Sequence, residues 1–327
     1  MNAFNRISSS RVLITGATGF IGEALTRSLI ELGADVICLA FNSRGQLDRL
    51  SHFDKAEIIE IDSSGNASLK KLLYDVKPEF VFNLASGGVK LGERDPLSLI
   101  EGNKELLKNL LNSVSSDSLK LFVHTGSWSE YEPQEGKKLI SEDCPLTYKA
   151  GYGGAKAQAM TMGLARAEHN GIPFVALRLF NVYGPGEGSH RLIPQLIQHL
   201  SLNDPIDLTP GDQVRDFVFI KDVVEAFMSI CHNPNPTNVN VYNICTGIPL
   251  RVRQVAEEVV HQMRRPKSLL RFGELPARTD EPDWMVGDGS KFRELTGWAP
   301  KTTIKEGVTK SIDYYLGTET TSNWSLD

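Results

Sequence analysis

A phenol and an ammonium group that could move a proton lie four residues apart in the segment Gly151-Tyr-Gly-Gly-Ala-Lys156. On a helix, this spacing places Tyr152 and Lys156 on the same face. A phenol with its ordinary pKa of about 10 is a poor acid at neutral pH, and a nearby ammonium lowers that pKa because it stabilises the phenolate. The pair therefore suits a reaction that transfers hydride to a carbonyl and a proton to the resulting alkoxide.

A Tyr–Lys pair with this spacing also occurs by chance in many proteins. Ser127 makes the assignment more specific. It follows an apolar stretch, residues 119–124, that indicates a buried strand. A hydroxyl at the end of such a strand can bond the same substrate oxygen that Tyr152 protonates. We expect Ser127, Tyr152 and Lys156 to be the catalytic residues.

A glycine-rich segment near the N-terminus predicts where the hydride donor binds. Thr15-Gly-Ala-Thr-Gly-Phe-Ile-Gly22 lies between a buried strand, Arg11–Thr15, and a helical pattern. In this position Gly16 allows a tight turn, Gly19 leaves room for a phosphate, and Gly22 lets the helix pack closely on the strand. The free N–H groups of the helix N-terminus then face a dinucleotide pyrophosphate.

The chain alternates strand and helix patterns, which is typical of a parallel, doubly wound α/β sheet. Strand-like segments occur at Arg11–Thr15, 35–40, 57–61, 80–85, 119–124 and Phe174–Leu179, and helical patterns, such as 68–76 and 103–114, separate most of them. After about residue 183, loops with glycine and proline become frequent. We predict a Rossmann-type NAD(P)-binding domain over about 1–182 plus 215–245, a smaller, interleaved α/β substrate domain over about 183–214 plus 246–316, and a frayed tail over 317–327.

Composition narrows the class of protein. The chain has 327 residues and a formal net charge of −5, with acids and bases mixed along it. This balance argues against a nucleic-acid or membrane surface. The seven histidines form no i, i+4 pair, so no metal site is expected. Four scattered cysteines without metal-ligand spacing predict reduced thiols in a cytoplasmic protein: Cys38, Cys144, Cys231 and Cys245.

The choice between NAD and NADP should depend on the end of the second strand, where an acid hydrogen-bonds the ribose 2′-hydroxyl of NAD. Here Ala40-Phe-Asn-Ser-Arg44 follows the strand and contains no acid. A guanidinium binds a 2′-phosphate, which a carboxylate would repel. We therefore expect NADP and keep NAD as the alternative. The residues expected at the adenosine end of the cofactor are Asn42, Ser43, Arg44, Asp62 and Ser63.

Together these motifs resemble the extended short-chain dehydrogenase/reductase family, in the branch that acts on nucleotide-activated sugars. The resemblance covers nearly the whole chain. Beyond the glycine turn and the catalytic trio, it rests on Asn83-Leu-Ala-Ser86, Asn103, Arg178-Leu-Phe-Asn-Val-Tyr-Gly-Pro185, Gly211-Asp-Gln-Val-Arg-Asp-Phe217, Asp222, Asn243, Arg278 with Asp280 and Glu281, Lys291, and Gly297-Trp-Ala-Pro300.

The resemblance implies roles for individual residues. Arg215 and Arg278 would hold the diphosphate of a nucleoside-diphosphate sugar, although a surface ion pair is the alternative for each, and Asn181 and Ser127 would also bind the substrate. A homodimer built through the helices at about 96–114 and 152–169 is also implied. The dinucleotide would contact Gly16, Thr18, Gly19, Phe20, Ile21, Gly22, Leu84, Ala85, Ser86, Tyr152 and Lys156.

Departures from the family pattern narrow the reaction. Sugar-nucleotide 4,6-dehydratases carry an Asp-Glu pair directly after the catalytic Ser or Thr, whereas Trp128 and Ser129 follow Ser127 here. A 4,6-dehydratase is therefore not expected. The trio with NADPH fits reduction of a 4-keto-6-deoxy sugar on a nucleoside diphosphate. A nucleotide-sugar 4-epimerase is the alternative, and a catalytically silent cofactor-binding or redox-sensing protein is the second alternative.

Overall fold

The centre of the molecule is a seven-stranded sheet in the order β11-β6-β5-β4-β1-β2-β3, and all its paired neighbours run parallel. The computed structural model describes residues 6–41, 50, 53–61, 66–86, 96–149, 151–232, 239–278 and 281–318. The strands of the sheet are β1 (Arg11–Thr15), β2 (Asp35–Phe41), β3 (Ala56–Ile61), β4 (Phe80–Asn83), β5 (Leu121–Ser127), β6 (Phe174–Leu179) and β11 (Asn240–Ile244). The predicted doubly wound α/β fold is confirmed.

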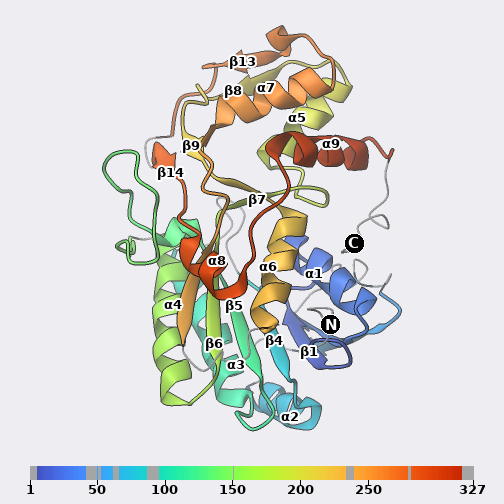
Figure 1. Ribbon diagram of the computed structural model, residues 1–327, viewed down its shortest axis with the longest axis vertical. Coiled ribbons are helices and arrows are strands. Elements are labelled where there is room, and N and C mark those ends of the chain that lie inside the picture. Colours follow the sequence, from blue (N-terminus) through green and yellow to red (C-terminus); the bar gives the residue numbers. More distant parts are fainter. Residues whose placement is uncertain are drawn as a thin grey trace.

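Two apolar layers cover this sheet because successive side chains of a strand point to opposite faces. In β1, Val12 and Ile14 join the core cluster on one face and Leu13 joins the cluster on the other. Figure 1 shows the helices on both faces. The first face packs against α1 (Phe20–Glu31) and α6 (Ile220–Cys231), and the second against α2 (Asn66–Val76), α3 (Pro96–Ser113) and α4 (Tyr152–His169).

Helices and short strands from the second half of the chain form the upper part of Figure 1. Helices α5 (Leu192–Ser201), α7 (Val252–Gln262) and α9 (Ile304–Tyr315) pack together there. The short strands pair as β7 (Asn181–Tyr183) with β10 (Phe217–Phe219), β8 (Ile206–Leu208) with β13 (Leu270–Phe272), and β9 (Val214–Arg215) with both β12 (Leu250–Arg251) and β14 (Trp284–Met285). The remaining elements are η2 (Trp128–Glu130), η3 (Lys267–Leu269) and α8 (Ser290–Thr296). The domain boundaries and the homodimer stay predictions.

The sheet differs from the sequence-based prediction most at three strands. Strand β4 ends at Asn83 and not at residue 85. Strand β5 covers Leu121–Ser127 and not residues 119–124, so Ser127 is the last residue of the strand itself. The seventh strand, β11, is absent from the sequence-based prediction and extends the sheet beside β6.

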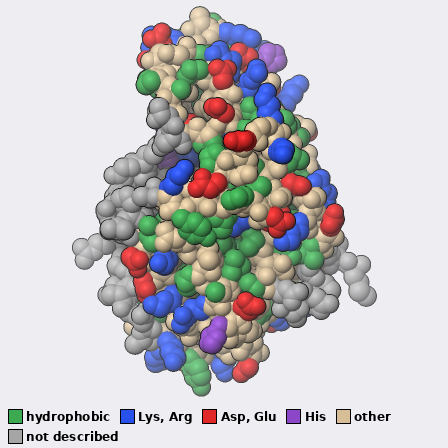
Figure 2. Space-filling view, turned by 90° about the vertical axis from the view of Figure 1, so that its left-hand side faces the viewer, with side chains coloured by type: hydrophobic (Ala, Val, Ile, Leu, Met, Phe, Trp, Pro, Cys, Tyr) green, Lys and Arg blue, Asp and Glu red, His purple; other side chains and the backbone are tan. Residues whose placement is uncertain are grey.

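The surface and the thiols add little that is unusual. Basic and acidic side chains are interspersed on the face that Figure 2 shows. The four cysteines are free, and three of them are buried. Within the described ranges, no helix combines the length and the apolar composition that crossing a membrane requires.

Asp222, in the first turn of α6, joins the C-terminal segment to that helix. The residue is 1% exposed. The carboxylate accepts hydrogen bonds from the backbone N–H groups of Lys301 (3.1 Å) and Thr302 (3.0 Å). The backbone carbonyl oxygen of Asp222 accepts one from Nε1 of Trp298 (3.1 Å). These bonds fix the chain that leads into α9.

We expect Asp222→Ala to lower the free energy of unfolding, because two backbone N–H groups lose their acceptor. The loss should be about 1–3 kcal/mol, the cost of leaving buried polar groups unsatisfied. Asp222→Asn keeps one acceptor oxygen and should lose less. Urea unfolding of the three proteins measures the effect, and an Asp222→Ala midpoint equal to wild type would contradict this role.

Candidate active site

The glycine turn lies where the winding of the sheet reverses, between β1 and β4. Gly16 has a positive φ of 75°, and a Cβ there would lie 2.6 Å from the backbone nitrogen of Ala85. A Cβ at Gly22 would overlap the carbonyl oxygen of Gly16. Only glycine therefore allows β1, the end of β4 and the first turn of α1 to meet. Ligands of doubly wound sheets bind at the carboxyl ends of the strands at such a reversal.

A chain of buried polar groups holds the strand ends beside this turn. The Thr15 hydroxyl donates to Oδ1 of Asn83 (2.7 Å) and accepts from the N–H of Ala85 (3.2 Å). Nδ2 of Asn83 lies 3.0 Å from Nδ1 of His124, so with Asn83 as donor the histidine carries its proton on Nε2. Burial, with a contribution from the charge of Lys156, lowers the pKa of His124 well below its ordinary value. The ends of β1, β4 and β5 are thus joined by neutral hydrogen-bonding groups.

Glycines also bring the catalytic helix to the end of β5. A Cβ at Gly153 would overlap the carbonyl oxygen of Ser129, and one at Gly154 would overlap that of Lys149. Helix α4 therefore begins in direct contact with the turn that follows Ser127. Nζ of Lys156, which is 3% exposed, donates to the carbonyl oxygen of Thr125 (2.8 Å).

The electrostatics of Tyr152 differ from the sequence-based expectation. Burial raises the pKa of the phenol to about 12, the Glu130 charge adds to the rise, and a hydrogen bond with Ser86 opposes it. The predicted lowering is therefore wrong for this structure, in which burial outweighs the stabilising groups and the Lys156 ammonium is directed at a carbonyl oxygen. Burial lowers the pKa of Lys156 to about 8, against the opposing influence of Glu130.

The hydroxyl of Ser127 is held by the residue two positions later. Oγ of Ser127 accepts a hydrogen bond from the N–H of Ser129 (3.2 Å) and one from its hydroxyl (2.8 Å). Ser127 and Lys156 are thus both held at the carboxyl end of β5, since Lys156 bonds the carbonyl oxygen of Thr125, two residues before Ser127. The structure brings the predicted trio into one neighbourhood, and the catalytic roles themselves stay predictions.

Glu130 is a site residue that the sequence-based prediction missed. Its side chain is 0% exposed. Oε1 accepts from the N–H of Ser127 (2.7 Å), and Oε2 accepts from Nε of Arg178 (2.7 Å). One signal in the sequence could have found it: Arg178 lies inside an apolar strand, and a buried guanidinium requires an acid.

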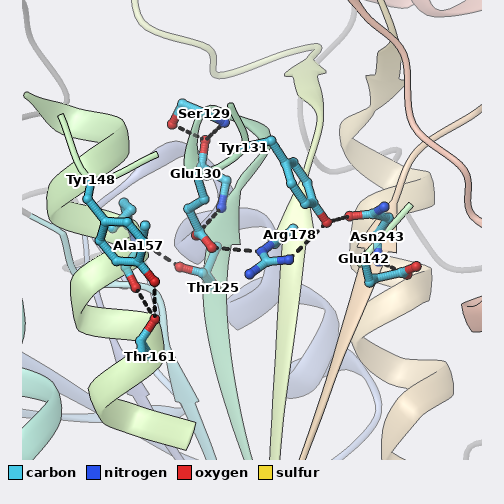
Figure 3. Close-up of polar contacts among 12 residues, drawn as sticks. Thr125, Ser129, Glu130, Tyr131, Glu142, Tyr148, Ala157, Thr161, Arg178 and Asn243 are labelled. Atoms are coloured by element: carbon cyan, nitrogen blue, oxygen red, sulfur yellow. Dashed lines mark hydrogen bonds and ion pairs between the residues drawn. The ribbon is translucent and has the colours of Figure 1, made fainter. Parts of the chain in front are cut away.

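From Arg178 the hydrogen bonds continue across the sheet, as Figure 3 shows. Nη1 of Arg178 donates to the Tyr131 hydroxyl (2.9 Å), which donates to Oδ1 of Asn243 (2.6 Å). The Arg178 guanidinium also lies 4.6 Å from the centre of the Tyr131 ring. The network therefore connects the turn after β5 with β6 and β11.

Glu281 links the two arginines predicted to bind the substrate, since it pairs with Arg215 and lines the same cavity as Arg278. Arg215 is 3% exposed, forms an ion pair with Glu281 (2.7 Å), and lies 5.5 Å from the centre of the Trp128 ring, directly after Ser127. Arg278 is exposed and lines a cavity of about 630 Å³ to which Glu281 also contributes. Nδ2 of Asn181 donates to the carbonyl oxygen of Asp216 (3.2 Å).

The predicted cofactor residues are described only in part. Leu84, Ala85 and Ser86 follow β4 beside the glycine turn, and Ser86 donates to Oδ1 of Asn103 (3.1 Å). The five residues expected at the adenosine end lie outside the described part of the chain: Asn42, Ser43, Arg44, Asp62 and Ser63. The same holds for Asp280.

Comparison with known proteins places this site in a family. The chain matches the "NAD dependent epimerase/dehydratase family" over residues 12–245. A UDP-glucose 4-epimerase from Lactobacillus helveticus is 28% identical over 313 residues, which cover 89% of this chain and 92% of that protein. A dTDP-6-deoxy-L-talose 4-dehydrogenase (NAD(P)(+)) from Kitasatospora kifunensis is 26% identical over 308 residues, covering 91% and 93%.

A solved structure agrees with these relatives. The UDP-glucose 4-epimerase of Thermotoga maritima, crystallised with UDP-glucose, superposes on this chain with a TM-score of 0.85 and 25% identity, covering 94% of this chain and 99% of that one. The family match covers more than half of the residues, and the glycine turn and the Tyr152–Lys156 helix lie within it. This protein belongs to the NAD-dependent epimerase/dehydratase family, the extended short-chain dehydrogenases/reductases that act on nucleotide sugars.

Proposed function

We propose that this enzyme reduces the 4-keto group of a 6-deoxy sugar on a nucleoside diphosphate, with NADPH as hydride donor. The observation that supports the proposal is the contact of helix α4 with the end of β5: Lys156 bonds the carbonyl oxygen of Thr125, two residues before Ser127, and Tyr152 bonds Ser86, which follows β4. The dinucleotide supplies hydride when bound, and the residues that would hold it are those of the turn, the end of β4 and Lys156. The dehydrogenase relative, which is named for a dTDP-6-deoxy sugar and NAD(P), supports this class of substrate.

The residues of the chain divide the remaining work. The Ser127 hydroxyl donates a hydrogen bond to the carbonyl oxygen. As the carbon gains hydride, the oxygen gains negative charge and takes the proton of the Tyr152 hydroxyl. The positive charge of Lys156 stabilises the phenolate that remains. Trp128 and Ser129 offer no carboxyl group for eliminating water, and Ser129 bonds Ser127 instead.

A 4-epimerase is the second candidate, because two of the compared proteins are UDP-glucose 4-epimerases. The same trio serves both reactions, since an epimerase oxidises and then reduces one carbon. The two differ in the balance of cofactor. A reductase consumes NADPH with each product, whereas an epimerase interconverts two sugars with no net consumption.

The first prediction tests the reaction and its acid. Wild-type protein should consume NADPH when mixed with a panel of 4-keto-6-deoxy nucleotide sugars. Tyr152→Phe keeps the ring and removes the transferable proton, so turnover should fall by about 10²–10⁴-fold, with NADPH binding nearly unchanged. Absorbance of NADPH follows turnover, and fluorescence follows binding. If the Phe variant reacts at the wild-type rate, Tyr152 is not the acid.

The second prediction concerns Lys156, which is expected to hold the nicotinamide ribose through its ammonium. This form exists below the lowered pKa of about 8 and is lost as pH rises through it. The Kd for NADPH should therefore rise above pH 8, by up to about tenfold per pH unit. Fluorescence titrations at several pH values measure it. Lys156→Met should bind weakly throughout, and the same pH dependence in that variant would assign the effect to another group.

The third prediction concerns cofactor choice. If Ser43 and Arg44 bind a 2′-phosphate, NADPH binds more tightly than NADH. Arg44→Ala should remove most of that preference, about 1.5–3 kcal/mol for a charged hydrogen bond. Titration of both cofactors decides the matter. Tighter binding of NADH by the wild type would overturn the NADP assignment and favour the epimerase.

The fourth prediction concerns the nucleotide. Arg215 and Arg278 are proposed to hold a diphosphate, so UDP, dTDP, CDP or GDP should compete with substrate, and one base should compete best. Arg278→Ala should weaken that competition and raise KM more than it lowers kcat, because the diphosphate is remote from the reacting carbon. NADPH binding should not change.

The matched control for Arg278 is Arg271→Ala, which removes an exposed arginine paired with Asp207. Nucleoside diphosphates should compete with substrate for this variant as strongly as they do for the wild type. Absence of competition by any nucleoside diphosphate at millimolar concentration would favour a small-molecule carbonyl reductase instead.

A further inference from the structure

The carboxylate of Glu130 is buried at the end of the three-residue turn that follows Ser127. It is fully enclosed and bonds the backbone N–H of Ser127 with one oxygen and Arg178 with the other, each at 2.7 Å. The sequence makes room for it, since a Cβ at Gly126 would lie 2.6 Å from Oε1 of Glu130. Both carboxylate oxygens of Glu130 are thus bonded to groups of the protein.

The hydrogen bonds within this turn leave the Ser127 hydroxyl free only as a donor. A hydroxyl has one donor and two acceptor positions. Oγ of Ser127 accepts from the N–H and from the hydroxyl of Ser129, so both acceptor positions are used. The O–H of Ser127 remains as a donor, which is what a substrate carbonyl oxygen requires.

The geometry of this turn depends on the bond between Glu130 and Ser127. The turn η2 spans three residues and is closed reciprocally: Ser127 accepts from within the turn, and Glu130 accepts from the Ser127 backbone. Arg178 neutralises the carboxylate and is itself held by Tyr131. A substitution at Glu130 should therefore displace Ser127, which it bonds directly, more than the glycine turn or α1.

We propose that Glu130 is a positioning residue, which fixes the turn at 127–130 so that the Ser127 hydroxyl donates to the reacting oxygen of the substrate. The inference rests on the proposed function, in which Ser127 bonds that oxygen. The hydrogen bonds of Glu130 go to Ser127 and Arg178, so its positioning effect passes through Ser127. Beside the larger effect of burial, its charge also raises the pKa of Tyr152 and opposes the lowering of the pKa of Lys156, and the test must separate this electrostatic effect from positioning.

A double-mutant cycle tests whether Glu130 acts through Ser127. Glu130→Gln keeps the size of the side chain, but its amide cannot accept from both Ser127 and Arg178. At saturating NADPH we expect kcat to fall about 10–100-fold, as for a small misplacement of a reacting group, with the KM for the sugar nearly unchanged. In the Ser127→Ala background the same substitution should cost less than about threefold, because residues that act together are not additive. Equal losses in both backgrounds, or no loss at all, would overturn the proposal.

Two further variants separate positioning from folding. Glu130→Leu combined with Arg178→Met removes both charges, so no buried ion is left unpaired. It still removes the acceptor of the Ser127 N–H and should show the same loss in kcat. Glu168→Gln, an exposed acid on α4, is the matched control and should behave as wild type. A double variant with the wild-type melting temperature and wild-type kcat would contradict the positioning role.

A readout without substrate keeps this test separate from the test of the reaction. The Ser127 amide should be protected from hydrogen exchange in wild type and exchange about tenfold faster or more in the Glu130→Leu/Arg178→Met variant, because its buried acceptor is lost. Unchanged exchange would overturn the proposal whatever the reaction is. If no 4-keto sugar is reduced, the proposed function fails, and the cycle is then measured on interconversion of UDP-hexoses, where Ser127 bonds the same oxygen.

Discussion

A charge that is removed from water must find its partners inside the protein, and the site of this enzyme is arranged around one such charge. The Glu130 carboxylate has no exposed surface and is neutralised by Arg178 from the neighbouring strand. Because the guanidinium also bonds Tyr131, and Tyr131 bonds Asn243, the compensation of one acid ties together the ends of β5, β6 and β11. The turn that bears Ser127 rests on this network.

Close backbone contacts supply the rest of the geometry. Glycines bring α1 to the end of β4 and α4 to the turn after β5, so that groups far apart in the sequence share one edge of the sheet. The proposed trio does not fix the direction of hydride transfer, since the same hydroxyls would bond the oxygen in oxidation and in reduction. Reductase and epimerase therefore differ through the affinity for the cofactor and the fit of the sugar, and not through the trio.

Much of this could be predicted from the sequence. Strands β1 and β6 agree with the prediction to the residue because each is a short apolar run with sharp ends. Strand β5 runs longer than predicted because its last residues are polar and face the site. Strand β11 is absent from the prediction because its asparagines interrupt the apolar pattern. Spacing predicted the trio, and its catalytic roles stay predictions. The raised pKa of Tyr152 depends on burial, which no local pattern in the sequence reports. Glu130 left an indirect signal, since Arg178 within an apolar strand requires a buried acid, but that signal does not say which acid pairs with it.

The contact between Gly153 and the carbonyl oxygen of Ser129 has a consequence for how such an enzyme can diverge. Any side chain at position 153 would push apart the helix that carries Tyr152 and the turn that follows Ser127, so one substitution would displace two residues of the proposed trio together. New specificities are thus open to the chain only through segments that leave this contact intact, such as those around Arg278. In the proposed function, backbone contacts would position the trio, and side chains such as Arg278 would select the sugar nucleotide.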